Sequence, residues 1–312
     1  MFIRQLEYLV ALAREKHFAR AAESCCVSQP ALSAGIRHLE QELGLSVVQR
    51  GQRYIGLSPE GERILEWARQ TLAAWQGLRQ VASVARSHLS GTLRLGAIPT
   101  TIPIVPLLTG PYRAAYPDLH QMVSSLSAEE IIRRLDDFEL DLGLTYLEDQ
   151  RLEGFRVWPL YRERYVLLAR NATSLAGCRE MTWAQAAELP LCLLTENMQN
   201  RRIITAAFRR ARVQPRVVIE TDSMFALCSH VLCADVFSIV PHSMLSLLEM
   251  RHELTAVPLL PELTRAIGLI AVEHDPLSPI VAAAWEITQA LDLEARFVHP
   301  ISENYQPIRA ST

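Results

Sequence analysis

Gln29, Ser33 and Arg37 recur at every fourth position, so on a helix they form one column on one face. A glutamine amide can make two hydrogen bonds to the edge of adenine, and an arginine guanidinium can make two to guanine. The column therefore predicts a helix that reads bases in the major groove of double-stranded DNA. The alternative that spacing alone leaves open is a three-helix bundle with a solvated polar face.

The start of this helix suits a phosphate group. Ser28 is a favourable N-cap that can donate to a phosphate at the positive helix end, and Pro30 lies where no N–H is needed. Gly35 costs about 1 kcal/mol relative to alanine inside a helix, so we expect another backbone to approach closely there. Apolar residues at steps of three and four predict the buried face: Leu32, Ile36, Leu39 and Leu43.

Composition limits how such a helix could bind DNA. The 312 residues are 49% hydrophobic and 21% charged, with a formal net charge of −3, which is typical of a globular protein of two or three domains. The first 60 residues hold seven basic and six acidic side chains, so phosphate contacts depend on placement rather than on excess charge.

Other features of the chain indicate its compartment. Charged residues interrupt the first 18 positions, and no apolar run approaches the roughly 18 residues of a membrane span. The six cysteines are scattered without CxxC spacing, which suits a reducing environment. We expect a cytoplasmic protein with no membrane partner.

Motifs for catalysis are missing. The chain has no G-x-S-x-G, no H-E-x-x-H, no Walker A sequence, and no G-x-G-x-x-G after a strand. Its nine histidines are dispersed, without metal-ligand spacing. We therefore expect no enzyme activity, no catalytic residues, no metal and no cofactor.

A long helix is predicted to begin at Ser58 and Pro59, a cap followed by a first-turn proline, and to end at Ser90 and Gly91. About 30 residues would span roughly 45 Å, a length that suits a spacer. Its apolar residues follow steps of three and four, as in a two-helix seam: Leu65, Ala68, Leu72, Trp75 and Ala82. A helix in a domain core is the alternative.

Downstream of Gly91, short apolar segments alternate with helical ones, which predicts an α/β region. The expected strands are TLRLGAI, LDLGLTY, RYVLLAR, LPLCLLT, RVVIET, FSIVP and RAIGLIAV. The expected helices cover residues 102–115, 128–137, 183–188, 200–211, 223–233 and 279–291.

The run LEYLVALAREKHFARAAESCCVSQPALSAGIRHLEQELG, followed by VVQR, LSPEG and the long helix, closely resembles the N-terminal winged helix-turn-helix of LysR-type transcriptional regulators. The resemblance implies that the helix over residues 29–43 enters the major groove and that Gln52 and Tyr54 lie in or beside the wing. Ala34 and Gly35 replace the family's usual Arg and Gln, which leaves fewer base-reading groups on that turn. The candidate DNA contacts are Ser28, Gln29, Pro30, Ser33, Arg37, Arg50 and Arg53.

The resemblance also implies the architecture. Residues 1–58 form the DNA-binding domain, residues 59–90 the linker and dimerisation helix, and residues 91–312 a two-lobed, periplasmic-binding-protein-like α/β effector domain. Lobe I covers about 91–161 and 267–312, and lobe II about 162–266. Family members assemble as homodimers and homotetramers, and RNA polymerase is a further candidate partner.

In such a domain a small-molecule effector binds between the lobes. Thr100 and Thr101 place hydroxyl and N–H groups at a helix N-terminus, which suits a carboxylate or another small anion, although ordinary N-capping uses the same residues. Thr145 and Tyr146 follow a strand at the end where open α/β sheets bind ligands. The second lobe is expected to contribute Thr195, Glu196, Asn197, Arg201, Ser223 and Met224.

Two other functions are alternatives to a ligand-gated regulator. The N-terminal region is particularly similar to peroxide-sensing members, but where those carry a reactive cysteine this chain has Met198 and Gln199. Cys228 and Cys233 are five residues apart on a predicted helix, a poor spacing for a disulfide. A thiol-based oxidant sensor of the same architecture is thus the alternative. A solute-binding or metabolic protein would explain residues 91–312 but not the N-terminal helices.

Overall fold

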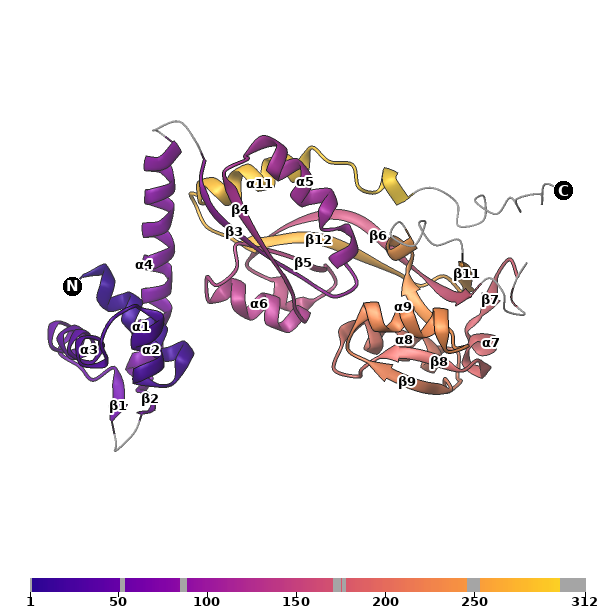
Figure 1. The fold of residues 1–312 in the computed structure, drawn as a ribbon, viewed down its shortest axis with the longest axis horizontal. Helices are drawn as coiled ribbons and strands as arrows, with labels where there is room; N and C mark the ends of the chain where they lie inside the picture. Colours follow the sequence, from indigo (N-terminus) through magenta and orange to yellow (C-terminus); the bar gives the residue numbers. More distant parts are fainter. Residues whose placement is uncertain are drawn as a thin grey trace. The chain divides into compact units, whose positions relative to one another are not determined.

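The computed structural model describes residues 2–50, 54–84, 89–170, 175, 178–245 and 253–297. The chain forms two compact units, one built mainly from the segment up to Ser90 and the other mainly from the segment that begins at Gly91. Figure 1 shows the elements of both units. Among the described residues, no helix combines the length and hydrophobicity needed to cross a bilayer.

The first unit is a three-helix bundle with a two-stranded wing (Figure 1). Its elements are α1 (Ile3–Glu15), α2 (Phe18–Ser24), α3 (Gln29–Leu43), β1 (Val48–Arg50) and β2 (Tyr54–Leu57). Leu32, Ile36 and Leu39 are fully buried in the bundle core, as predicted. The prediction for Leu43 was wrong: this side chain is 40% exposed, because α3 ends there and Gly44 takes a left-handed conformation with φ of 68°.

Two polar side chains fix the wing and the next helix on the bundle. Glu40 Oε1 accepts hydrogen bonds from the backbone N–H groups of Val47 (3.0 Å) and Val48 (3.1 Å), which holds the start of β1 against α3. Ser58 Oγ donates to the carbonyl of Ser46 (2.6 Å) and accepts from the N–H of Gly61 (2.9 Å). The second bond caps the first turn of α4 (Pro59–Val84).

The predicted seam of α4 is divided between two environments. Leu65 and Ala68 are buried in the bundle core and Leu72 packs against it. Trp75 and Ala82 are exposed. The first half of the helix therefore completes the first unit, and the exposed apolar side chains lie mostly farther along it: Trp67, Trp75, Leu78 and Val81.

The second unit has two lobes that share one long strand, β6 (Phe155–Arg170). Residues up to Arg164 pair with β12 (Thr264–Val272), and residues from Tyr165 onwards pair with β10 (Ser238–Pro241) and β11 (Leu254–Leu260). The chain thus passes between the lobes at Arg164 and Tyr165 and returns between β11 and β12. This mixed α/β, two-lobed architecture confirms the predicted fold class.

Each lobe adds its own strands and helices. The first contains β3 (Gly91–Ala97), β4 (Leu119–Ser125), β5 (Leu142–Tyr146), α5 (Pro106–Ala115), α6 (Ala128–Asp136), α11 (Pro279–Gln289) and short turns η1 (Ile102–Ile104), η2 (Gln150–Leu152) and η4 (Ala295–Phe297). The second contains β7 (Met181–Thr182), α7 (Trp183–Glu188), β8 (Leu191–Leu194), α8 (Gln199–Arg210), β9 (Val217–Thr221), α9 (Met224–Cys233) and η3 (His242–Met244). In the first sheet β3 pairs in parallel with β4 and β5, and β12 joins β5 to β6 (Figure 1).

Candidate functional site

The outer face of α3 carries the predicted column. Gln29 and Arg37 are exposed and Ser33 is half-buried. Within the described residues, these three side chains make no hydrogen bond or ion pair, so their polar ends are available to another molecule. Ser28 Oγ accepts from the N–H of Ala31 at 3.4 Å, and Pro30 lies exposed in the first turn.

Gly35 lies on the inner side of α3, and the expectation for it was half right. Something does approach closely, but it is the aromatic ring of Tyr8 on α1 rather than a backbone. The glycine therefore sets the distance between α1 and α3 and has no part in the exposed column.

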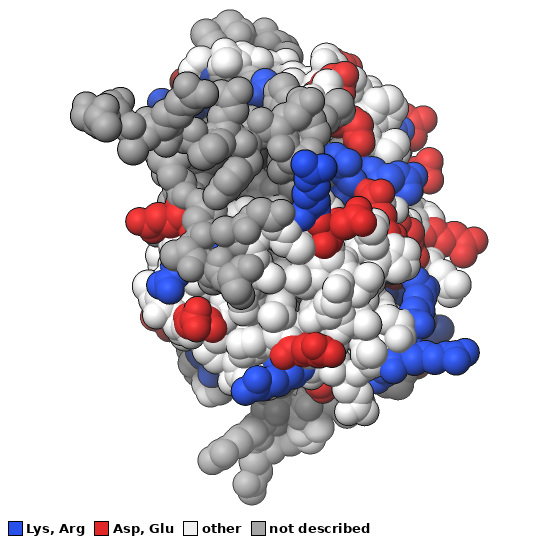
Figure 2. Space-filling model, turned by 90° about the vertical axis from the view of Figure 1, so that its right-hand side faces the viewer, with Lys and Arg blue, Asp and Glu red and all other residues white. Residues whose placement is uncertain are grey.

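Much of the predicted wing lies outside the described residues. Gln52 and Arg53 fall there entirely. Arg50 and Tyr54 are described only as backbone partners at the end of the β1–β2 ladder. On the face drawn in Figure 2, basic and acidic side chains are interspersed, in keeping with the small net charge of −3.

A small pocket lies between the two lobes of the second unit. Its empty space, part of which is open solvent, is about 260 Å³. The first lobe contributes Ile98, Pro99, Thr100, Ser127, Ala128 and Tyr146, and the second contributes Leu194, Met198, Gln199 and Asn200. Because both lobes line it, a molecule bound there would contact both.

Sequence reasoning found Thr100 and Tyr146 and missed the other polar lining residues, Ser127, Gln199 and Asn200. Ser127 could have been found from the sequence, because a serine directly before a helix with acidic residues in its first turn is a capping signal. In the structure its hydroxyl accepts from the N–H of Glu130 (3.2 Å) and caps α6. Gln199 and Asn200 lie between the predicted residues Asn197 and Arg201, and neither carries a charge that would mark it as an anion contact.

A chain of hydroxyl groups crosses from one lobe to the other behind the pocket. Thr100 Oγ1 lies 3.3 Å from the hydroxyl of Tyr146, which lies 3.1 Å from the hydroxyl of Tyr165. Asn200 Nδ2 donates to the Tyr165 hydroxyl at 3.4 Å. Burial raises the pKa of both tyrosines, so their hydroxyls stay neutral and can both donate and accept.

Glu163 lies two residues before Tyr165 and is completely buried. Burial raises the pKa of its carboxyl group to about 8, while the nearby hydroxyls of Tyr165, Ser243 and Tyr146 act in the opposite direction. At neutral pH this side chain is therefore mainly an uncharged acid.

The predicted arginine of the second lobe has a structural role. Arg201 is 6% exposed, and its guanidinium donates to the carbonyl of Leu194 (2.7 Å) and pairs with Glu220 (2.6 Å). It does not line the pocket. Binding an anion through Arg201 would require breaking these contacts.

The other predicted residues lie around the pocket rather than in its wall. Thr195 donates to Asn197 Oδ1 (2.7 Å), and Glu196 is exposed. Ser223 caps α9 by accepting from Ala226 (3.3 Å), and Met224 packs against the core of the second lobe. Two threonines of the first lobe are fully buried: Thr101 donates to the carbonyl of Ile98 (3.0 Å), and Thr145 Oγ1 has no partner among the described residues.

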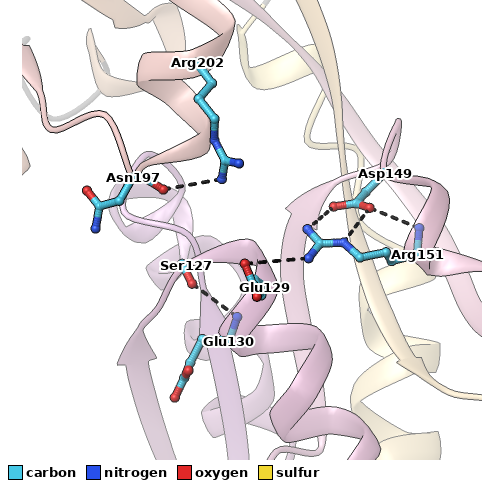
Figure 3. A network of polar contacts seen from close by, with 7 residues as sticks. All are labelled: Ser127, Glu129, Glu130, Asp149, Arg151, Asn197 and Arg202. Atoms are coloured by element: carbon cyan, nitrogen blue, oxygen red, sulfur yellow. Dashed lines mark hydrogen bonds and ion pairs between the residues drawn. The ribbon is translucent and has the colours of Figure 1, made fainter.

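Charged side chains gather beside the pocket (Figure 3). In the first lobe, Arg151 pairs with Asp149 at 2.7 Å and approaches Glu129 at 3.9 Å. On α8, Arg202 donates to the carbonyl of Asn197 at 3.3 Å. Hydrogen bonds from Arg151 lower the pKa of Asp149 most, and the charge of Arg202 on the second lobe contributes least to the same effect.

The cysteines lie outside the pocket wall. All six are thiols; Cys192 and Cys228 are buried, and burial raises the pKa of Cys192 to about 11. A thiol with so high a pKa is a weak nucleophile at neutral pH. The more exposed thiols are Cys26, Cys178 and Cys233.

Comparison with known proteins agrees with this arrangement. Residues 3–62 match the family described as bacterial regulatory helix-turn-helix protein, lysR family, and residues 86–292 match the LysR substrate binding domain. A hydrogen peroxide-inducible genes activator from Haemophilus influenzae is 35% identical over 192 residues, 61% of each chain. An SDS degradation transcriptional activation protein from a Pseudomonas species is 32% identical over 90% of this chain and 93% of its own. A full-length OxyR variant from Pseudomonas aeruginosa superposes with a TM-score of 0.72 at 26% identity, covering 94% of this chain and 98% of that one.

Proposed function

Because this chain belongs to the LysR family of DNA-binding transcriptional regulators, we propose that α3 reads its operator and that a small effector bound between the lobes controls transcription. The observation that carries the proposal is the pocket lined by residues of both lobes. A ligand that contacts both lobes binds one lobe arrangement more tightly than another, and only such a difference can shift a conformational equilibrium.

We propose Gln29, Ser33 and Arg37 as base-reading residues and Thr100, Ser127, Tyr146, Gln199 and Asn200 as effector contacts. The first turn of α8 begins at Gln199 without a side-chain cap on Met198, so its N–H groups favour an acceptor such as a carboxylate. Among the described residues that line the pocket there is no Lys or Arg. A small organic acid or another small anion would thus be held by N–H and hydroxyl groups.

Self-association follows from α4 in this proposal. Trp67, Trp75, Leu78 and Val81 are exposed on it, and apolar side chains on a long helix favour pairing with a second copy. Two α3 helices on one duplex would bind more tightly than one. A homodimer through α4, extended to a homotetramer through the lobes, is the proposed assembly, with RNA polymerase as a further candidate partner.

Gel-shift assays with the DNA upstream of the protein's own gene test this function, in the presence of a panel of small organic acids or of hydrogen peroxide. Saturable binding that one acid alters supports the proposal. A response to peroxide alone would favour an oxidant sensor, the second candidate suggested by the name of the Haemophilus relative. Absence of specific binding to this DNA and to a genomic fragment pool would overturn the assignment of α3.

A further inference from the structure

An acidic side chain is buried at the point where the chain crosses between the lobes. Tyr161, Glu163 and Tyr165 alternate along β6 and therefore point to the same side of the strand. All three are buried. Tyr165 is the first residue of β6 that pairs with the second lobe, so Glu163 lies at the crossing itself.

Among the residues that the structure describes, no positive charge compensates this acid. Within the described residues, neither carboxyl oxygen of Glu163 has a hydrogen bond of ordinary geometry, but the hydroxyls of Tyr165, Ser243 and Tyr146 lie near enough to lower its pKa. Arg265, its partner across the β6–β12 ladder, donates to the carbonyl of Thr264 (2.7 Å). The guanidinium of Arg164 is directed to the carbonyl of Phe297 (3.3 Å) and to Glu262 (3.9 Å).

The remaining neighbours are neutral or acidic. His242 on η3 accepts a hydrogen bond from the N–H of Arg164, and burial lowers its pKa to about 4, so it is uncharged at neutral pH. Glu148, after β5, raises the pKa of Glu163 further. The other groups that act on Glu163 or on the tyrosines beside it include Thr100, Tyr146, Tyr161, Tyr165, Asn200, Ser243 and Glu294.

We propose that Glu163 is a positioning residue of the effector pocket, which supports Tyr146 and Tyr165 through its protonated carboxyl group, so that closing the lobes around an effector takes up a proton. This inference rests on the proposed effector pocket. Glu163 does not line the pocket; it acts through Tyr146, which does, and through Tyr165, which binds Asn200.

The physical reason is the difference in hydration between closed and open lobes. Separating Thr100 and Tyr146 from Asn200 admits water to the carboxyl group, which then ionises near its ordinary pKa of 4.5, whereas the closed form holds the proton up to a pKa of about 8. Between these values closure binds a proton, so closure weakens as the pH rises. When each closing event takes up one proton, the equilibrium constant for closing falls tenfold for each unit by which the pH rises.

Hydrogen exchange of the full chain, without DNA or effector, tests the proposal. Protection of residues 98–101 and 198–202, corrected for intrinsic exchange, should fall at least tenfold between pH 6 and pH 8.5, while residues 93–96 of β3 stay protected. In Glu163→Gln, whose amide cannot ionise, pocket protection should not change over this range. Glu163→Leu serves as a second variant with the same expectation.

Glu153→Gln is the matched control, because Glu153 is an exposed glutamate just before β6. It should keep the wild-type pH profile. A wild-type profile in both Glu163 variants, or a loss of protection spread evenly over the second unit, would overturn the proposal. Since this experiment needs no operator, failure of DNA binding would overturn the proposed function and leave the exchange result interpretable.

Discussion

The ring of Tyr8 occupies the space that a side chain at Gly35 would need. A Cβ atom on residue 35 would lie 2.6 Å from Cδ2 and 2.8 Å from Cε2 of that ring. Tyr8 is itself buried between α1 and α3. The glycine thus permits the helix contact that presents Gln29 and Arg37 to solvent.

Gly35→Ala should lower the free energy of unfolding of the first unit by about 1 to 2 kcal/mol, because the cost of overpacking exceeds the gain in helix propensity. Calorimetry on the full chain measures the change. Gly77→Ala on α4 is the matched control, since the nearest atom to its new Cβ would lie at 3.9 Å. This control should be stabilising by up to about 1 kcal/mol; equal effects of both substitutions would contradict the steric explanation.

The helices and strands whose apolar residues recur at one regular spacing could be predicted from the sequence. The helix over residues 183–188 and most strands of the second unit appear where apolar periodicity placed them. The first half of β6 was missed because Pro159 interrupts the pattern; the ladder accommodates it with an irregularity where Gly268 faces Pro159. β11 was missed for a similar reason, since it contains Pro258, and β4 was missed because its sequence, LHQMVSS, is largely polar.

The pocket could be predicted only in part, because its wall depends on contacts between distant segments. Thr100 follows β3 and Tyr146 ends β5, positions that local sequence reveals. Tyr146 and Tyr165 meet only when the lobes fold together. Arg201 was predicted as an effector contact because of its charge. In the structure Glu220, 19 residues away, binds that side chain inside the second lobe.

Replacing Arg201 tests that structural role. Arg201→Met should lower the free energy of unfolding by about 2 kcal/mol, because it leaves Glu220 and the Leu194 carbonyl without their partner. The loss is smaller than for a fully buried ion pair because the Glu220 side chain is 47% exposed to solvent. Arg202→Met, an exposed neighbour on α8, is the control and should change stability little in the same urea titration. If Arg201→Met were as stable as the wild type, the structural role would be wrong and Arg201 would again be a candidate effector contact.

The column on α3 predicts a specific loss of operator affinity. Gln29→Ala and Arg37→Ala should each weaken specific binding by about 1 to 3 kcal/mol if each side chain makes a bidentate base contact. Arg210→Ala removes an exposed charge from the last turn of α8 and should leave binding unchanged. Quantitative gel shifts at one fixed salt concentration compare the three. Wild-type affinity in both α3 variants would mean that the column is a solvated face.

Thiol accessibility separates the two candidate functions. Ellman's reagent should react quickly with Cys26, Cys178 and Cys233 in the folded protein and with Cys192 only after denaturation, because burial raises the pKa of Cys192 to about 11. Mass spectrometry of the labelled peptides identifies the sites. Rapid labelling of Cys192 in the native state would make it a candidate for oxidant sensing.

The buried imidazole of His242 predicts an acid-dependent loss of stability. Burial lowers its pKa to about 4 from an ordinary value of 6.5, so the unfolded chain takes up a proton that the folded chain does not. This stabilisation is fully present above pH 6.5 and is lost as the pH falls towards 4, by up to about 3 kcal/mol. His242→Asn keeps an acceptor for the N–H of Arg164 without a titrating group, so between pH 7 and pH 5 its melting temperature should fall less than that of the wild type. Parallel decreases in the two proteins would show that the carboxyl groups, rather than His242, account for the acid sensitivity.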